Sequence, residues 1–137
     1  MHRLAVLFCL GGLAAPAAAD VFPFKTPSGN IQCYVGVGES SDIDCTIWDR
    51  SGPPAAPKPA SCRGPWGHRV QMAERGPVSL ICGAPGPRNT APGVEVAPYG
   101  QTGRWGGISC SSTPQGLDCR NGSGHGFRLS RASQQVW

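Results

Sequence analysis

Charge, aromatic side chains and large aliphatic side chains are all scarce in this sequence. Charged residues make up 15% and aromatic residues 7% of the 137 residues, and beyond the N-terminal segment no stretch repeats apolar residues at helical spacing. This composition excludes a helical bundle and a large α/β enzyme. The 20 glycines and 14 prolines are typical of a loop-rich chain. A disordered chain would carry more net charge than the +4 found here.

The motifs of familiar enzyme classes are absent as well. There is no Gly-x-Ser-x-Gly elbow, His-Glu-x-x-His helix, phosphate-binding loop or dinucleotide fingerprint, and no Cys-x-x-Cys pair that would indicate zinc. His125, Ser130 and Asp118 could supply a catalytic triad only if folding brought them together. We therefore expect a protein that is not an enzyme and that uses no cofactor or metal ion.

Residues 1–19 have the organisation of a signal peptide. A short basic region precedes an apolar stretch at residues 4–13, and an alanine-rich stretch ending at Ala19 supplies the small residues that a signal peptidase requires. The apolar stretch is shorter than the roughly 20 residues that a membrane-spanning helix needs. We expect cleavage before Asp20, export to the periplasm or the extracellular space, and a single domain at residues 20–137 with no membrane span.

Export would also explain the cysteines, because oxidising compartments allow a small domain with a thin core to be held together by disulfides. Six of the seven cysteines lie beyond residue 19. An even number in an exported chain predicts three disulfides, although counting alone does not choose the pairs. The six are Cys33, Cys45, Cys62, Cys82, Cys110 and Cys119.

The register of a β-hairpin pairs Cys33 with Cys45. Apolar side chains alternate with polar or small ones along residues 31–37 and 43–47, and a turn-rich segment connects them. When the two cysteines lie opposite each other, every inward-facing residue of one strand meets an inward-facing residue of the other. The pairs formed in this way are Ile31 with Ile47 and Val35 with Ile43.

A second hairpin pairs Cys110 with Cys119. It turns at residues 113–116, Thr-Pro-Gln-Gly, whose proline and glycine suit a type I turn. Cys62 and Cys82 then pair by elimination, which ties a proline-rich segment to the hairpin that follows it.

These patterns predict an all-β fold, a small disulfide-stapled domain built from β-hairpins with long Pro/Gly-rich loops. The longest loops are expected at residues 52–65 and 83–103, the second of them with one short strand. Phe127 and Leu129 alternate as a strand would, and a turn of helix is expected from Ser130.

Three motifs give the sequence a resemblance to a known family. They are F-x-TPSGNI-x-C at residues 24–33, PYG at residues 98–100 and SGHGF-x-LSR at residues 123–131. With the six cysteines, they resemble an uncharacterised family of small exported bacterial proteins, classed as a domain of unknown function. The resemblance implies a bacterial exported domain, and it implies no activity, cofactor or catalytic residue.

The C-terminal part of the sequence is its most basic region. From residue 104 onward there are four arginines and only one acidic residue, Asp118. Arginines near aromatic residues favour carboxylate, phosphate or sugar ligands. Arg120, His125 and Arg128 are therefore candidate ligand contacts. In the alternative interpretation the arginines only solvate the surface, and His125 bonds a nearby carbonyl within a glycine bend.

The expected function is that of an exported, non-catalytic binding module for an envelope or extracellular ligand, either a polymer or a protein. Inhibition of a secreted hydrolase is the alternative, because rigid stapled domains with exposed loops often act in that way. Nucleic acid is not an expected partner, since exported domains seldom meet it and the net charge is modest. The protein is expected to be a monomer.

Overall fold

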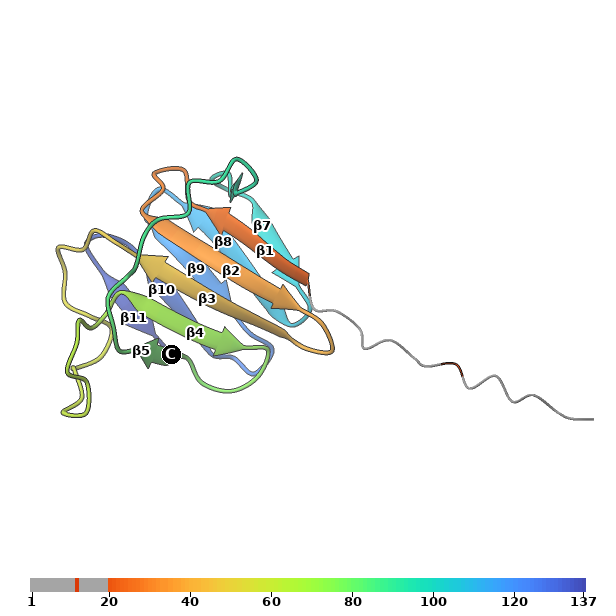
Figure 1. Ribbon diagram of the computed structural model, residues 1–137. Helices are drawn as coiled ribbons and strands as arrows, with labels where there is room; N and C mark the ends of the chain where they lie inside the picture. Colours follow the sequence, from red (N-terminus) through yellow and green to blue (C-terminus); the bar gives the residue numbers. More distant parts are fainter. Residues whose placement is uncertain (1–11, 13–19) are drawn as a thin grey trace, which may run out of the picture.

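The structure, a computed structural model, describes Gly12 and residues 20–137, and it contains no helix among them (Figure 1). Two β-sheets pack face to face, so the all-β prediction is confirmed. The signal peptide predicted at residues 1–19 lies outside the described residues, Gly12 apart. The described part of the chain includes no helical segment with the length and apolarity that a bilayer crossing requires.

The first sheet, sheet A, has six strands in the order β5-β4-β3-β2-β1-β6. Neighbouring strands are antiparallel, except that β6 runs parallel to β1. Because β1 to β5 follow one another as a meander, only the connection from β5 to β6 has to cross the sheet. The strands are β1 (Asp20–Lys25), β2 (Ile31–Val37), β3 (Ser41–Ile47), β4 (Arg69–Ala73), β5 (Ser79–Ile81) and β6 (Glu95–Val96).

The second sheet, sheet B, is a five-stranded antiparallel meander in the order β11-β10-β9-β8-β7. It lies behind sheet A in the view of Figure 1, where its strands are coloured cyan to blue. The strands are β7 (Thr102–Trp105), β8 (Ile108–Thr113), β9 (Gly116–Arg120), β10 (Gly126–Leu129) and β11 (Gln134–Val136).

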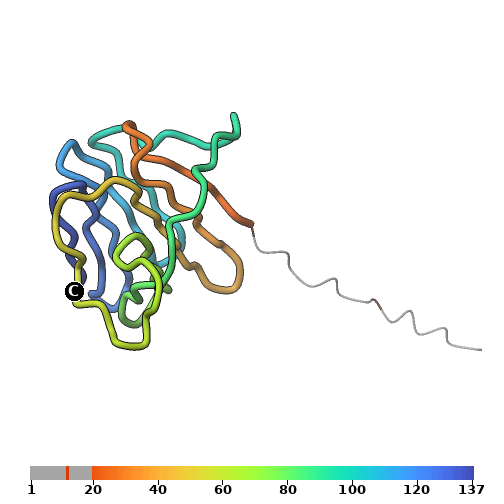
Figure 2. Tube along the Cα trace, turned by 60° about the vertical axis from the view of Figure 1, so that its left-hand side comes forward, coloured from red at the N-terminus to blue at the C-terminus, as the bar shows by residue number. Residues whose placement is uncertain are grey.

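A single hydrophobic core fills the space between the sheets, which Figure 2 shows as two layers of the chain. Alternate residues of each strand point inward, as the period of a β-strand requires. Phe127 is the largest fully buried side chain, and Ile43, Ile108 and Leu117 surround the same interior with no more than 1% exposure. The core is thin, so each buried aromatic ring carries a large share of its stability.

Two disulfides lie within this core and join directly opposite residues of neighbouring strands. Cys33 bonds Cys45 and Cys110 bonds Cys119, each with a Cα–Cα distance of 4.1 Å. Such a short separation is typical of antiparallel pairs that do not exchange backbone hydrogen bonds. Both hairpins have the registers that the alternation of their residues predicts.

The third disulfide joins Cys62 to Cys82, with a Cα–Cα distance of 5.6 Å. It ties the long connection between β3 and β4 to the residue that follows β5. That connection extends beyond the sheets at one side of the molecule (Figure 1). All three disulfides are consistent with an oxidising environment.

The turn of helix predicted from Ser130 is wrong. The chain instead reverses between β10 and β11, where the Ser130 N–H donates to the Ser133 carbonyl at 2.9 Å. Pairing with β10 then holds β11 as a strand. Buried Gln134 donates to the nearby Ser130 carbonyl at 2.7 Å and accepts from the distant Arg50 at 3.1 Å. A short polar segment without its own apolar pattern takes the structure that its neighbours impose.

The connection from β5 to β6 crosses the outer face of sheet A from one edge to the other (Figure 1). We call this segment, residues 82–94, the strap. It has no secondary structure of its own, and β6, which follows it, is the short strand that was expected in this part of the chain. The strap therefore covers part of a sheet face that would otherwise lie open to solvent.

Candidate functional site

The candidate ligand contacts Arg120 and Arg128 lie on the outer face of sheet B, where they share one carboxylate. Asp118 accepts a hydrogen bond from Arg128 Nη2 at 2.8 Å and from Arg120 Nε at 3.3 Å. The arginine side chains remain 65% (Arg120) and 49% (Arg128) exposed. The structure thus brings the two arginines together and leaves both accessible to solvent.

The third candidate, His125, is held by the backbone around it. Its ring Nδ1 donates to the Trp137 carbonyl at 3.1 Å, and its backbone N–H donates to Asn121 Oδ1 at 3.0 Å. Gly124, with a φ of +83°, makes the bend that permits these contacts. Arg120 lies close by, with its guanidinium carbon 5.4 Å from the centroid of the Trp137 ring. This geometry supports the interpretation in which His125 is structural.

The substitution His125→Ala should lower the melting temperature by about 3–6 °C, because it removes a hydrogen bond worth about 1 kcal/mol from a domain of this size. Thermal unfolding followed by circular dichroism measures the change. Gln115→Ala, in the exposed turn between β8 and β9, is the control and should change the melting temperature little. A melting temperature unaffected by His125→Ala would contradict the structural role.

The three residues that could have formed a catalytic triad are separately engaged. Asp118 binds the two arginines, His125 donates to Trp137, and the Ser130 hydroxyl donates to the Ser133 carbonyl at 2.9 Å. Within residues 20–137 the structure groups no three His, Cys, Asp or Glu side chains so that they could hold a metal ion.

A second set of polar side chains, which the sequence reasoning missed, lies on the outer face of sheet A. The strand registers place Tyr34, Asp44 and Gln71 in one row across β2, β3 and β4, with Thr46 and Arg69 in the adjacent row. All five alternate with core residues, so they face away from the interior. Three neighbouring strands therefore present one continuous polar surface.

Asp44 orders the centre of this surface. Its Oδ2 accepts hydrogen bonds from Arg69 Nη2 at 2.9 Å and from Gln71 Nε2 at 2.8 Å. The two donors lie two residues apart on β4 and therefore face the same side of the sheet. A carboxylate held by two donors keeps a fixed orientation, and its other oxygen makes no hydrogen bond to any described residue.

The strap brings two aromatic residues into the same site. Trp48 donates through Nε1 to the Gly86 carbonyl at 2.9 Å, and the Arg88 guanidinium carbon lies 4.9 Å from the Trp48 ring centroid. Asn89 donates to the Tyr34 hydroxyl at 3.0 Å. These contacts hold both rings in place, while Tyr34 remains 43% exposed.

A groove of about 330 Å³ lies between the strap and the outer face of sheet A. A second hollow of about 320 Å³ shares Asp44 with it and continues along the same strands. We call the first hollow the strap groove. Aromatic and proline walls with a polar floor suit a ligand that has apolar faces and a hydroxyl rim. The strap groove is lined by Gln32, Tyr34, Asp44, Thr46, Trp48, Arg69, Pro85 and Pro87.

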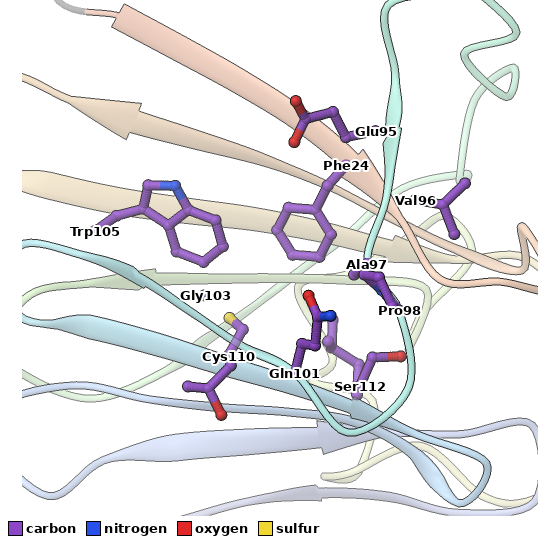
Figure 3. A pocket seen from close by; sticks show the side chains of 12 residues that line it. Phe24, Glu95, Val96, Ala97, Pro98, Gln101, Gly103, Trp105, Cys110 and Ser112 are labelled. Atoms are coloured by element: carbon purple, nitrogen blue, oxygen red, sulfur yellow. The ribbon is translucent and has the colours of Figure 1, made fainter.

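A smaller cavity opens between the edges of the two sheets (Figure 3). The rings of Phe24 and Trp105 stack there at a centroid distance of 5.5 Å, and the amide end of Gln101 points toward Phe24. Ser112 also lines the cavity, and its buried hydroxyl has no hydrogen-bond partner among the described residues. The volume, about 160 Å³, matches one six-membered ring, since a cavity of about 150 Å³ holds benzene. The cavity is therefore too small for a polymer.

Comparison with known proteins identifies a family and nothing narrower. No curated protein and no solved structure matches the chain. A family model matches residues 3–137, which include every described strand. The family has no assigned activity, so it adds no chemistry to the strap groove, and the motifs and exported character that the sequence resemblance implies stay predictions. The chain belongs to DUF6636, a family of unknown function.

Proposed function

We propose that the protein is an exported, non-catalytic module that binds a neutral polysaccharide in the strap groove. The predicted signal peptide and the three disulfides support export, because such bridges persist in oxidising compartments. The polysaccharide would be the envelope or extracellular polymer that the sequence analysis expects as a partner.

One observation carries this proposal: two fixed aromatic rings lie beside an ordered polar floor. Tyr34 and Trp48 border the groove. On its floor, Asp44 accepts hydrogen bonds from Arg69 and Gln71. A sugar ring presents C–H faces that stack on aromatic rings, while its hydroxyls bond carboxylates, amides and guanidinium groups. The groove offers both kinds of contact within one site.

The charge of the groove favours an uncharged polymer. Arg69 is paired with Asp44, and Asp42 adds a further carboxylate in the adjoining hollow. A polyanion would meet these carboxylates at close range and be repelled. The two hollows follow one another along the strands, so a chain of sugars fits better than a single unit.

The variant Tyr34→Ala should weaken binding to a neutral polysaccharide about 3–10-fold, because it removes a stacking surface worth about 1 kcal/mol. Affinity gel electrophoresis in laminarin, mannan and xyloglucan measures retardation of the protein by each polymer. Tyr34→Phe keeps the ring and should retain most of the binding. Tyr99→Ala is the matched control, because Tyr99 is 50% exposed and lies outside the strap groove.

Equal weakening by Tyr34→Ala and Tyr99→Ala would contradict the placement of the site in the groove. If none of the neutral polymers retards the protein, the result would contradict the proposal that the ligand is a neutral polysaccharide. Capture of a secreted hydrolase from culture medium, with no polymer bound, would favour the inhibitor instead.

A further inference from the structure

The outer face of sheet B has a composition unlike that of sheet A. The strand registers set Arg104, Ser109 and Arg120 in one row across β7, β8 and β9. The adjacent row contains hydroxyl, amide and charged side chains and no large apolar one. Its members are Thr102, Ser111, Asp118, Arg128 and Gln135.

Positive charge predominates on this face. Arg104, Arg120 and Arg128 project from it, and Asp118 is the one carboxylate in the two rows. Neighbouring strands lie about 4.8 Å apart, so Arg104 and Arg120, two strands apart, have backbones separated by roughly 10 Å. Ser109 lies between them and has a short side chain, so the space above the sheet is open to a ligand.

Asp118 shows how this face holds a carboxylate. It accepts from Arg128 through Nε and Nη2, at 3.2 and 2.8 Å, and from Arg120 through Nε alone. Arg120 therefore retains both of its terminal nitrogens as donors, and Arg104 makes no ion pair with any described residue. These free N–H donors belong to guanidinium groups, and a guanidinium can bind one carboxylate through two parallel hydrogen bonds.

We propose that the outer face of sheet B is a second binding surface, which takes a polysaccharide bearing carboxylate groups. A membrane is a poorer match, because the face offers no cluster of apolar side chains for insertion, and Trp137 stands alone at its margin. Duplex DNA is also a poorer match, because it needs more phosphate contacts than three arginines supply. This surface is on sheet B and the strap groove is on sheet A, so each proposal can be tested without the other.

The double variant Arg104→Gln, Arg120→Gln should weaken binding to alginate about 5–25-fold at low salt, since each exposed ion pair contributes up to about fivefold. Arg128 remains to pair with Asp118, so no carboxylate is left without its partner. Asp118→Asn should act in the opposite direction and strengthen binding about 2–5-fold, because it releases both arginines. Affinity electrophoresis in alginate gels measures all three proteins, and added salt should weaken retardation.

The double variant Lys58→Gln, Arg63→Gln is the charge-matched control, since both residues are exposed on the connection between β3 and β4. It should weaken alginate binding less than twofold. Tyr34→Ala should leave alginate binding unchanged, and the double arginine variant should leave neutral polymers bound as before. An equal effect of the control double variant and the Arg104→Gln, Arg120→Gln variant would overturn the surface, as would weaker binding by Asp118→Asn. Tighter binding to vesicles of anionic lipid or to duplex DNA than to alginate would overturn the choice of ligand.

Discussion

Replacing Cys110 and Cys119 together with alanine is expected to lower the free energy of unfolding by about 2–5 kcal/mol, the usual loss for a native disulfide in a small exported domain. The bridge joins directly opposite residues of β8 and β9, and both cysteines are buried in the core. The thin core leaves little apolar burial to offset the loss. Urea unfolding followed by tryptophan fluorescence measures the difference.

The matched control is an exposed pair across the same part of sheet B. Thr102 and Ser111 lie opposite each other on β7 and β8, with their hydroxyls 2.8 Å apart. Replacing both with alanine should cost less than about 1 kcal/mol, because water can take the place of either hydroxyl. A cysteine double variant that unfolds at the same urea concentration as its parent would show that the bridge is not needed for stability.

The substitution Phe127→Ala should cost about 3–5 kcal/mol, the loss measured for large aromatic residues in cores. Phe127 is fully buried on β10, opposite Cys119 on one side and Val136 on the other. Removing the ring leaves a cavity where the two sheets meet, and the disulfide beside it limits how far the strands can move to fill it. Differential scanning calorimetry measures the loss.

Phe22→Ala is the control for this prediction. Phe22 is on β1 opposite Val35, so the strand register turns it toward the same side as Phe24. It lies before the residues of β1 that pair with β6, at an open edge of sheet A, and it is 47% exposed. Its removal should cost about 1 kcal/mol or less, in proportion to the smaller area buried. Similar losses from the two variants would mean that burial does not set the contribution of these rings.

The hairpins could be predicted from the sequence because their contacts are local. Residues 31–47 contain both strands and the turn, so the alternation of apolar residues fixes the register within one short segment. The same reasoning holds for residues 108–120. Each disulfide in these hairpins then follows from the register.

The strap groove could not be predicted in the same way because its residues come from distant segments. Gln32 and Asn89 exchange two hydrogen bonds, at 2.8 and 3.1 Å, although 57 residues separate them. A segment rich in proline and glycine has no periodicity that would indicate which sheet face it crosses. Tyr34 and Asp44 alternate with the core residues of the hairpin, but polar residues on that face suit plain solvent exposure equally well.

His125 and the arginines near it illustrate a further limit. Arg120 and Arg128 lie close together because only residues 121–125 separate β9 from β10, which pair with each other. Closeness in sequence did not show that Asp118 binds both arginines or that His125 donates to Trp137. These contacts depend on the pairing of β10 with both of its neighbours, which the expected helical turn at Ser130 obscured.

The most direct test of the polysaccharide site is a two-dimensional ¹H–¹⁵N spectrum of the four tryptophan indoles during titration with oligosaccharides of the retained neutral polymer. Trp48 lies in the strap groove, with its indole N–H bonded to Gly86, whereas Trp66, Trp105 and Trp137 lie outside it. We predict that the Trp48 signal moves on binding while the other three stay in place. Movement of the Trp105 or Trp137 signal with a stationary Trp48 signal would contradict the proposed site.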